Sequence, residues 1–201
     1  MIGVVDYGMG NLKSIANALD FLKIDYIISR NIEELESCDR YILPGVGAFK
    51  DAIEYIKDNS LDSFLINMTK INKPLLGICL GMQLLFEKSY EGGETLGLGL
   101  ILGKVIKLDR EMVRVPHIGW NSIDKNKDDF LVKEIKNKTF MYYVHSFYAI
   151  DYDINDLILY SHYGDIKIPG LIRKGNIIGA QFHPEKSGED GLKILKAFNN
   201  I

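Results

Sequence analysis

In the N-terminal half of the chain, short apolar runs alternate with segments in which apolar residues recur at helical spacing. The runs have the length of strands, and each ends at a polar or glycine-containing turn. Apolar residues between Leu12 and Leu22 recur every three or four positions, which is typical of an amphipathic helix. The pattern predicts strands at 2–6, 25–29, 40–43 and directly before Cys79, and helices at 12–22, 31–37 (capped by Asn31), from about 49 to 58 and at 61–71. This alternation predicts an α/β fold with a central, mostly parallel sheet flanked by helices.

Beyond Ser89 glycines become frequent and short strand patterns follow one another closely. Strands are predicted at 104–108, 139–144, 147–151, 157–162 and 177–182, a short helix at 130–135 and a final helix at 188–198. We interpret these strands as antiparallel additions to the parallel core, and the segment 115–121 as a loop. No repeat, low-complexity tract or linker interrupts the chain, so we expect a single domain over residues 1–201.

Charge and composition narrow the class of protein. The formal net charge of −3 gives no electrostatic footprint for nucleic acid. No apolar run reaches the length of a membrane span, and the N-terminus lacks the basic and long apolar regions of a signal peptide. We therefore expect a cytoplasmic protein whose cysteines, Cys38 and Cys79, stay reduced. Cys38 lies in a polar stretch and is expected to be structural.

Cys79 has the sequence context of a nucleophile. It is the centre of Gly77-Ile78-Cys79-Leu80-Gly81, which joins an apolar run to a segment that can continue as a helix. A nucleophile between two such glycines is typical of the tight strand-to-helix turn called a nucleophile elbow. Glycine is needed there because a Cβ two residues from the nucleophile would collide with the strand or the helix. The turn would expose the sulfur at a helix N-terminus, where partial positive charge favours the thiolate.

A cysteine nucleophile needs a base, and His183 has the most suitable position. It follows the predicted strand that ends at Gln181, and Pro184 favours an extended backbone at His183. Glu185, two residues further along an extended chain, would return to the same side and orient the imidazole. We therefore predict a row of Cys79, His183 and Glu185.

The glycine-rich loop 44–49 follows the third predicted strand, at the sheet edge where ligands bind in α/β proteins. Its N–H groups would complete an oxyanion hole facing Cys79. His145 would either contact a polar substrate or be a satisfied core histidine, and His117 would serve packing or a contact surface. No cluster has the spacing of zinc ligands, and Gly8-Met9-Gly10 lacks the third glycine of a dinucleotide loop, so no metal or cofactor is expected.

Several motifs together resemble a known family. The motifs GICLGMQ at 77–83 and QFHPE at 181–185 resemble the class I, or triad, glutamine amidotransferases. Five further motifs resemble the glutaminase subunits of imidazole glycerol phosphate synthases: DYGMGN at 6–11, PGVGAF at 44–49, VPHIGWN at 115–121, YYVHSF at 142–147 and FHPEKS at 182–187. The resemblance extends along essentially the whole chain and implies a flavodoxin-like amidotransferase fold.

The resemblance also implies roles for individual residues. Cys79 would attack the side-chain amide of L-glutamine, with His183 and Glu185 completing the triad. Backbone N–H groups of Gly45, Val46, Gly47 and Leu80 would form the oxyanion hole. The other implied residues are Gln83, His145, Ser146 and Phe147 for glutamine binding and Asn11, Trp120, Tyr142 and Lys186 for the partner interface.

A single domain leaves no room for a second active site that would use the ammonia. The resemblance implies a heterodimer with a TIM-barrel cyclase subunit, reached by ammonia through a shielded passage, in histidine biosynthesis. The alternative is a paralogous amidotransferase that supplies ammonia to a sugar-modifying enzyme of surface polysaccharide synthesis. Less favoured alternatives are the glutaminase partner of pyridoxal phosphate synthase, a non-catalytic scaffold and a monomeric cysteine hydrolase of γ-glutamyl peptides.

Overall fold

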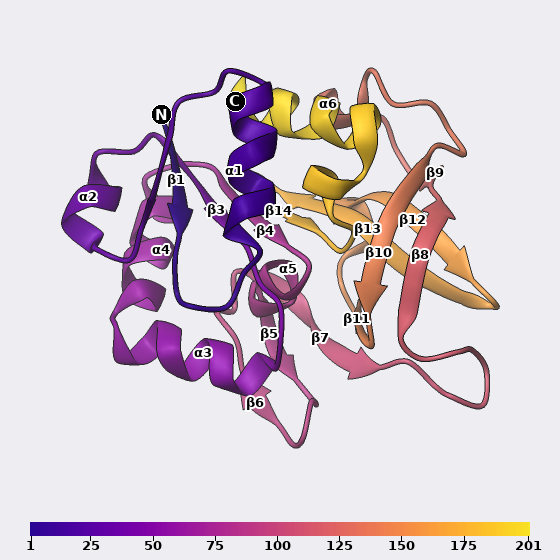
Figure 1. Cartoon of the computed structure of the whole chain (residues 1–201). Coiled ribbons are helices and arrows are strands. Elements are labelled where there is room, and N and C mark those ends of the chain that lie inside the picture. Colours follow the sequence, from indigo (N-terminus) through magenta and orange to yellow (C-terminus); the bar gives the residue numbers. More distant parts are fainter.

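A computed structural model describes residues 1–201 and contains a large sheet of eight strands. Its strands lie in the order β2-β1-β3-β4-β14-β13-β12-β9 (Figure 1). Their bounds are β1 Ile2–Val5, β2 Tyr26–Ser29, β3 Arg40–Leu43, β4 Leu75–Ile78, β9 Asp124–Lys125, β12 Leu157–Tyr163, β13 Ile166–Lys174 and β14 Ile177–Ala180. The first five strands in this order are parallel to one another, and the last three are antiparallel additions. The α/β fold predicted from the sequence is therefore confirmed.

Helices cover both faces of the sheet. They are α1 Leu12–Phe21, α2 Ile32–Glu36, α3 Phe49–Asp58, α4 Leu61–Lys70, α5 Leu80–Leu84 and α6 Gly188–Asn199, with short 3₁₀ turns η1 Phe130–Val132, η2 Ile154–Asp156 and η3 Pro184–Lys186. Helices α1 and α6 pack on one face, and α2, α3 and α4 pack on the other (Figure 1). Each face has its own apolar core, because the buried strands are hydrophobic on both sides. Asn31 caps α2 as predicted, accepting a hydrogen bond from the N–H of Glu33 at 2.9 Å.

Two small sheets complete the molecule. One pairs β8 His117–Ser122 with β10 Phe140–His145, and the other has the order β11-β7-β5-β6. The strands of this four-stranded sheet are β5 Phe86–Ser89, β6 Thr95–Leu96, β7 Ile101–Lys107 and β11 Phe147–Ile150. No helix has both the length and the apolar character required to cross a membrane.

Three expectations about the C-terminal half are corrected. The strands expected at 104–108, 139–144 and 147–151 are not additions to the central sheet; as β7, β10 and β11 they belong to the two small sheets. The segment 115–121, expected to be a loop, contains β8, whose pattern is hidden by Pro116 and Gly119. The strand expected at 177–182 is not an antiparallel addition, because β14 pairs in parallel with β4. Strand β13 was not predicted, because Pro169 and Gly170 interrupt its apolar run.

Candidate active site

Cys79 lies in a strained turn between β4 and α5. Its backbone has φ 56° and ψ −109°, which is unusual for a residue with a side chain. The N–H of Cys79 donates to the carbonyl of Ala180 at 2.7 Å, so the neighbouring strand β14 holds the turn in place. A Cβ on Gly77 would lie 2.5 Å from the carbonyl oxygen of Gly81, and one on Gly81 would collide with the carbonyl of Leu43. Both glycines are therefore required by backbone contacts. Helix α5 has only five residues, so its dipole is a smaller aid to the thiolate than the sequence suggested.

His183 and Glu185 are placed by the adjacent parallel strand. Ala180 of β14 pairs with Ile78 of β4, so the residues after both strands meet at one edge of the sheet. His183 is extended, with φ −97° and ψ 96°, as Pro184 predicts. Glu185 reaches the imidazole through the 3₁₀ turn η3, and not through the extended chain that we expected. The distance from His183 Nδ1 to Glu185 Oε1 is 2.7 Å, and the two side chains are 3% and 1% exposed.

The proton positions of this pair follow from its chemistry. A carboxylate only accepts hydrogen bonds, so Nδ1 carries a proton and donates it to Glu185. Nε2 of His183 is buried without a hydrogen-bond partner, while the Cys79 thiol donates to the carbonyl of Val144 at 3.6 Å. Burial is the largest influence on His183 and lowers its pKa, but Cys79 and Glu185 together raise the pKa above its ordinary value. His183 therefore holds its proton more strongly than an ordinary histidine does.

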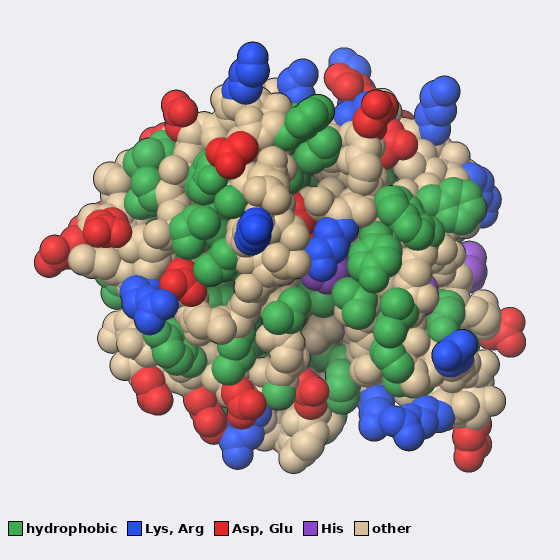
Figure 2. All heavy atoms as spheres, viewed as in Figure 1, with side chains coloured by type: hydrophobic (Ala, Val, Ile, Leu, Met, Phe, Trp, Pro, Cys, Tyr) green, Lys and Arg blue, Asp and Glu red, His purple; other side chains and the backbone are tan.

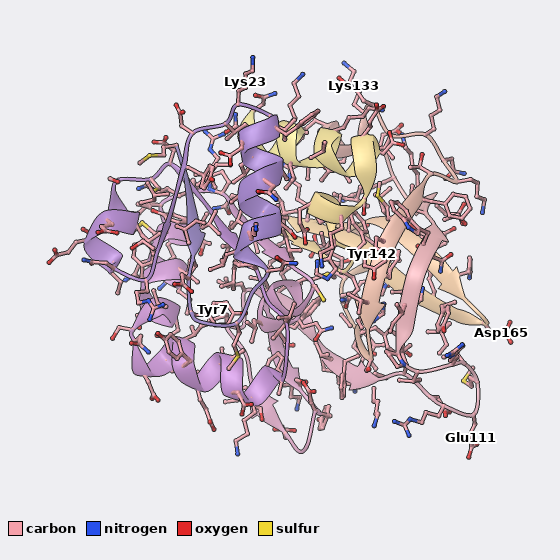
Figure 3. The ribbon with its side chains drawn as sticks, in the orientation of Figure 1. Tyr7, Lys23, Glu111, Lys133, Tyr142 and Asp165 are labelled. Carbon is pink, nitrogen blue, oxygen red and sulfur yellow. The ribbon has the colours of Figure 1, made fainter.

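Ser187, which sequence reasoning missed, fixes the backbone of His183. Its hydroxyl donates to the carbonyl of His183 at 2.6 Å and accepts from the N–H of Tyr142 on β10 at 3.0 Å. The N–H of His183 donates in turn to the carbonyl of Tyr142 at 2.9 Å. Tyr142 is labelled in Figure 3. The β8–β10 sheet and the segment after β14 are therefore held together at the site.

A cavity of about 330 Å³ opens onto Cys79, within the size range of small-molecule sites. Cys79 lines it but His183 does not. The walls of the cavity contain most of the residues expected to bind the oxyanion or the substrate: Val46, Gly47, Leu80, Gln83, His145, Ser146 and Phe147. Gly45 lies beneath the wall, where a Cβ would collide with the Tyr7 hydroxyl. That hydroxyl donates to the carbonyl of Pro44 at 2.7 Å and secures the loop. Tyr7 is labelled in Figure 3.

Glu91, also missed from the sequence, is the one charged side chain in the wall of this cavity. Its Oε2 accepts from the N–H of Phe49, at the start of α3, at 2.8 Å. The carboxylate is therefore held in place by a helix terminus. Its position depends on how the chain between β5 and β6 folds back toward α3, for which the sequence offers no local signal.

A chain of hydrogen bonds of defined polarity runs behind the cavity. The carbonyl of Phe147 accepts from His145 Nδ1 at 2.9 Å, so the proton of neutral His145 is on Nδ1 and its Nε2 is an acceptor. His117 Nδ1 donates to that Nε2 at 3.0 Å, and His117 Nε2 then accepts from Asn121 Nδ2 at 3.3 Å. His117 is stacked between Tyr143 and Tyr163. His145 is thus a satisfied core histidine, and the backbone of residues 145–147 is what remains available to a ligand.

The two buried histidines predict a loss of stability in acid. Burial lowers the pKa of His117 to about 4, and burial together with His117 lowers the pKa of His145 to about 3. Both are neutral in the folded protein at pH 5, whereas unfolded histidines with a pKa of about 6.5 are protonated. Their contribution to stability is present above pH 6.5 and is lost as the pH falls toward 4 and 3. We expect the free energy of unfolding to fall by about 2 kcal/mol per histidine between pH 7 and pH 5.

Urea denaturation at the two pH values measures this loss. The variant His117→Gln lacks one titrating group, so its stability should fall by about 2 kcal/mol less than that of the unmodified chain. Carboxylates titrate equally in both proteins and cancel in the comparison. An equal fall in both proteins would contradict a neutral, buried His117.

The residues expected at a partner interface lie on neighbouring elements. Trp120 and Tyr142 are paired across β8 and β10, with ring centroids 6.0 Å apart. Asn11 directly precedes helix α1, and Lys186 is the last residue of η3. The turn η3 contacts both α1 and β10, so these elements are neighbours. Asn11 also caps α1 by accepting from the N–H of Ser14 at 3.2 Å. Around Trp120, which is 55% exposed, Ile118 and Phe140 are also exposed, and Figure 2 shows hydrophobic side chains gathered over β8 and β10.

Comparison with known proteins places the chain in a family. The family model described as glutamine amidotransferase class-I matches residues 3–200. The imidazole glycerol phosphate synthase subunit HisH of Caldanaerobacter subterraneus is 48% identical over 202 residues, covering 100% of this chain and 98% of that protein. The subunit of the same name from Bacillus licheniformis is 47% identical over 206 residues, covering 100% of this chain and 96% of that protein.

Solved structures agree in fold. A crystal structure of a glutamine amidotransferase has a TM-score of 0.77 at 19% identity, covering 100% of this chain and 99% of that chain. The structure of PurLQS from Thermotoga maritima has a TM-score of 0.76 at 20% identity, covering 99% and 97%. The chain therefore belongs to the class I glutamine amidotransferases, a family of glutamine-hydrolysing enzymes.

Proposed function

We propose that this chain is the glutaminase subunit of an imidazole glycerol phosphate synthase. It would hydrolyse L-glutamine to glutamate and ammonia and pass the ammonia to a cyclase subunit in histidine biosynthesis. The observation that carries this proposal is the full-length similarity, at 44–48% identity, to proteins named as that subunit. The residues at the strained turn supply the chemistry.

The reaction starts from the anionic sulfur of Cys79 beside protonated His183. The sulfur attacks the side-chain amide carbon of glutamine, and a tetrahedral intermediate with a negative oxygen forms. His183 transfers its Nε2 proton to the amide nitrogen, and the carbon–nitrogen bond breaks. Ammonia departs, and the glutamyl group remains bound to Cys79 as a γ-glutamyl thioester. His183 then takes a proton from water, whose oxygen attacks the thioester to give glutamate and to return the thiolate. Glu185 holds Nδ1 throughout, so Nε2 always faces the reacting atoms.

The negative oxygen requires hydrogen-bond donors in the wall of the cavity beside Cys79. Leu80 is the first residue of α5, so its N–H is one of those that a helix leaves without an internal partner. Val46, 42% exposed, and Gly47, with φ 104°, belong to the loop at 44–49 and line the same cavity. We propose that the N–H groups of the loop at Gly45, Val46 and Gly47 complete the oxyanion hole with Leu80.

The α-amino and carboxylate groups of glutamine require partners of opposite charge or polarity. Gln83 and the backbone of Ser146 and Phe147 lie on the cavity wall. Glu91 is the only carboxylate there, so we assign it to the α-ammonium group. Both hydrogens on Nε2 of Gln83 are donated to Phe147 and Gln181, so its free amide oxygen would also accept from the ammonium group. The backbone N–H groups of residues 146 and 147 would hold the carboxylate.

Ammonia released to water at neutral pH is protonated and loses its nucleophilic lone pair, so a shielded passage to a second subunit is required. The exposed apolar residues on β8 and β10, together with Tyr142 on β10 and with Asn11 and Lys186 on adjacent elements, form the surface that we assign to the cyclase. An apolar centre with a polar rim is typical of a stable interface. The assembly would be a cytoplasmic heterodimer in which the cyclase subunit carries the lyase step.

Genetic complementation tests the proposal. The chain, expressed with the cyclase encoded in the same genome, should restore growth without histidine to a bacterium lacking its own synthase. A Cys79→Ser variant expressed equally should not restore growth when ammonia is limiting. Failure of the unmodified chain, together with glutamine-dependent activity in the presence of a sugar-modifying synthase, would favour the paralogous function instead.

A further inference from the structure

Gln181 has a buried side-chain amide beside the sulfur of Cys79, and this amide has not yet been given a role. It follows β14 directly, is 0% exposed, and its backbone N–H donates to the carbonyl of Gly170 at 2.9 Å. Its side chain lies between Gln83 and Cys79, with Oε1 3.0 Å from Gln83 Nε2 and Nε2 3.9 Å from Cys79 Sγ. An uncharged amide is buried only when its polar atoms have partners, and here one partner is the sulfur.

The direction of these hydrogen bonds is determined by a backbone carbonyl. The oxygen of Phe147 can only accept, so Gln83 must direct its Nε2 toward it, at 2.9 Å. The second hydrogen on that Nε2 then points to Gln181, which must present its Oε1. The Nε2 of Gln181 is consequently the atom turned toward the sulfur. The opposite orientation would place two NH₂ groups against each other.

We propose that Gln181 is a positioning residue that donates a hydrogen bond to the Cys79 sulfur and stabilises its anionic form. The inference rests on the proposed role of Cys79 as the nucleophile. An amide cannot release its proton at neutral pH, so this donor stabilises the thiolate without competing with His183 as the acid. Gln83 lines the cavity, so the Gln181 amide connects a residue of the cavity wall to the Cys79 sulfur.

The test measures the thiol directly and does not depend on glutamine hydrolysis. The rate of alkylation of Cys79 by iodoacetamide is measured against pH in the full-length chain, with mass spectrometry separating Cys79 from Cys38. Gln181→Met keeps the length of the side chain and removes the donor. Loss of a hydrogen bond to an ion shifts the midpoint of the alkylation profile upward by about one pH unit, which lowers the rate below the midpoint about tenfold.

Two further variants make the result decisive. Gln83→Met releases the amide of Gln181 from its fixed orientation, so it should also raise the midpoint of the alkylation profile, by less than Gln181→Met does. If Gln181→Met does not fold, Gln83→Met provides the test. Tyr143→Phe is the matched control, because it removes a buried hydrogen bond to Ser161 of 2.8 Å outside this chain of contacts and should leave the profile unchanged.

An unchanged midpoint in a folded Gln181→Met protein, or in Gln83→Met if the first variant is unfolded, would overturn the proposal. A shifted midpoint in a chain that releases no glutamate with its partner would instead support the role of Gln181 and contradict the glutaminase function.

Discussion

Replacing Cys79 with alanine is expected to abolish glutamine-dependent synthesis by the complex while synthesis from added ammonium salts continues. The sulfur is the only group at the strained turn that can form the thioester, so its loss should lower glutamine hydrolysis by roughly 10³-fold or more. Ammonia from solution bypasses this site and reaches the partner's active site directly. Product formation by the complex is measured with each nitrogen source in turn.

Cys38→Ala is the matched control for this experiment. Cys38 is equally a free, buried cysteine, but it lies in the core between the sheet and α2, away from the cavity. Its replacement should leave both reactions active. If Cys79→Ala abolished both reactions, or neither, the division of labour between the two subunits would be wrong.

Glu185→Gln is expected to lower kcat for glutamine by about 10²- to 10⁴-fold with little change in KM. An amide can turn its NH₂ group toward Nδ1, which would move the imidazole proton to Nε2 and leave no acceptor facing the thiol. The substitution also removes a charge that raises the pKa of His183, and burial then lowers that pKa. Nuclear magnetic resonance of the imidazole as a function of pH should therefore show His183 deprotonating at a lower pH.

Glu189→Gln provides the control for Glu185→Gln. Glu189 is an exposed carboxylate in the first turn of α6, four residues along the chain, and its replacement should change neither kcat nor the titration of His183. An unchanged titration in Glu185→Gln would show that the 2.7 Å contact does not control the protonation of the ring.

What could be read from the sequence depended on local physical rules. Alternating apolar runs predicted the parallel strands and the helices that cover them, because burial on both faces selects such runs. The glycines around Cys79 predicted the tight turn, since only glycine avoids the backbone contacts found at positions 77 and 81. Pro184 predicted the extended conformation of His183, because proline restricts the residue before it.

The direction of β14, the strand β8 and the roles of Glu91, Gln181 and Ser187 could not be predicted in this way. Each depends on contacts between segments far apart in the chain: Ser187 with Tyr142, Glu91 with Phe49 and Gln181 with Cys79. The sequence by itself determined which residues have the chemistry and which turns they occupy, because backbone sterics and periodicity act over a few neighbours. Only the tertiary structure decided which polar groups meet, because buried hydrogen bonds form wherever packing brings a donor and an acceptor together.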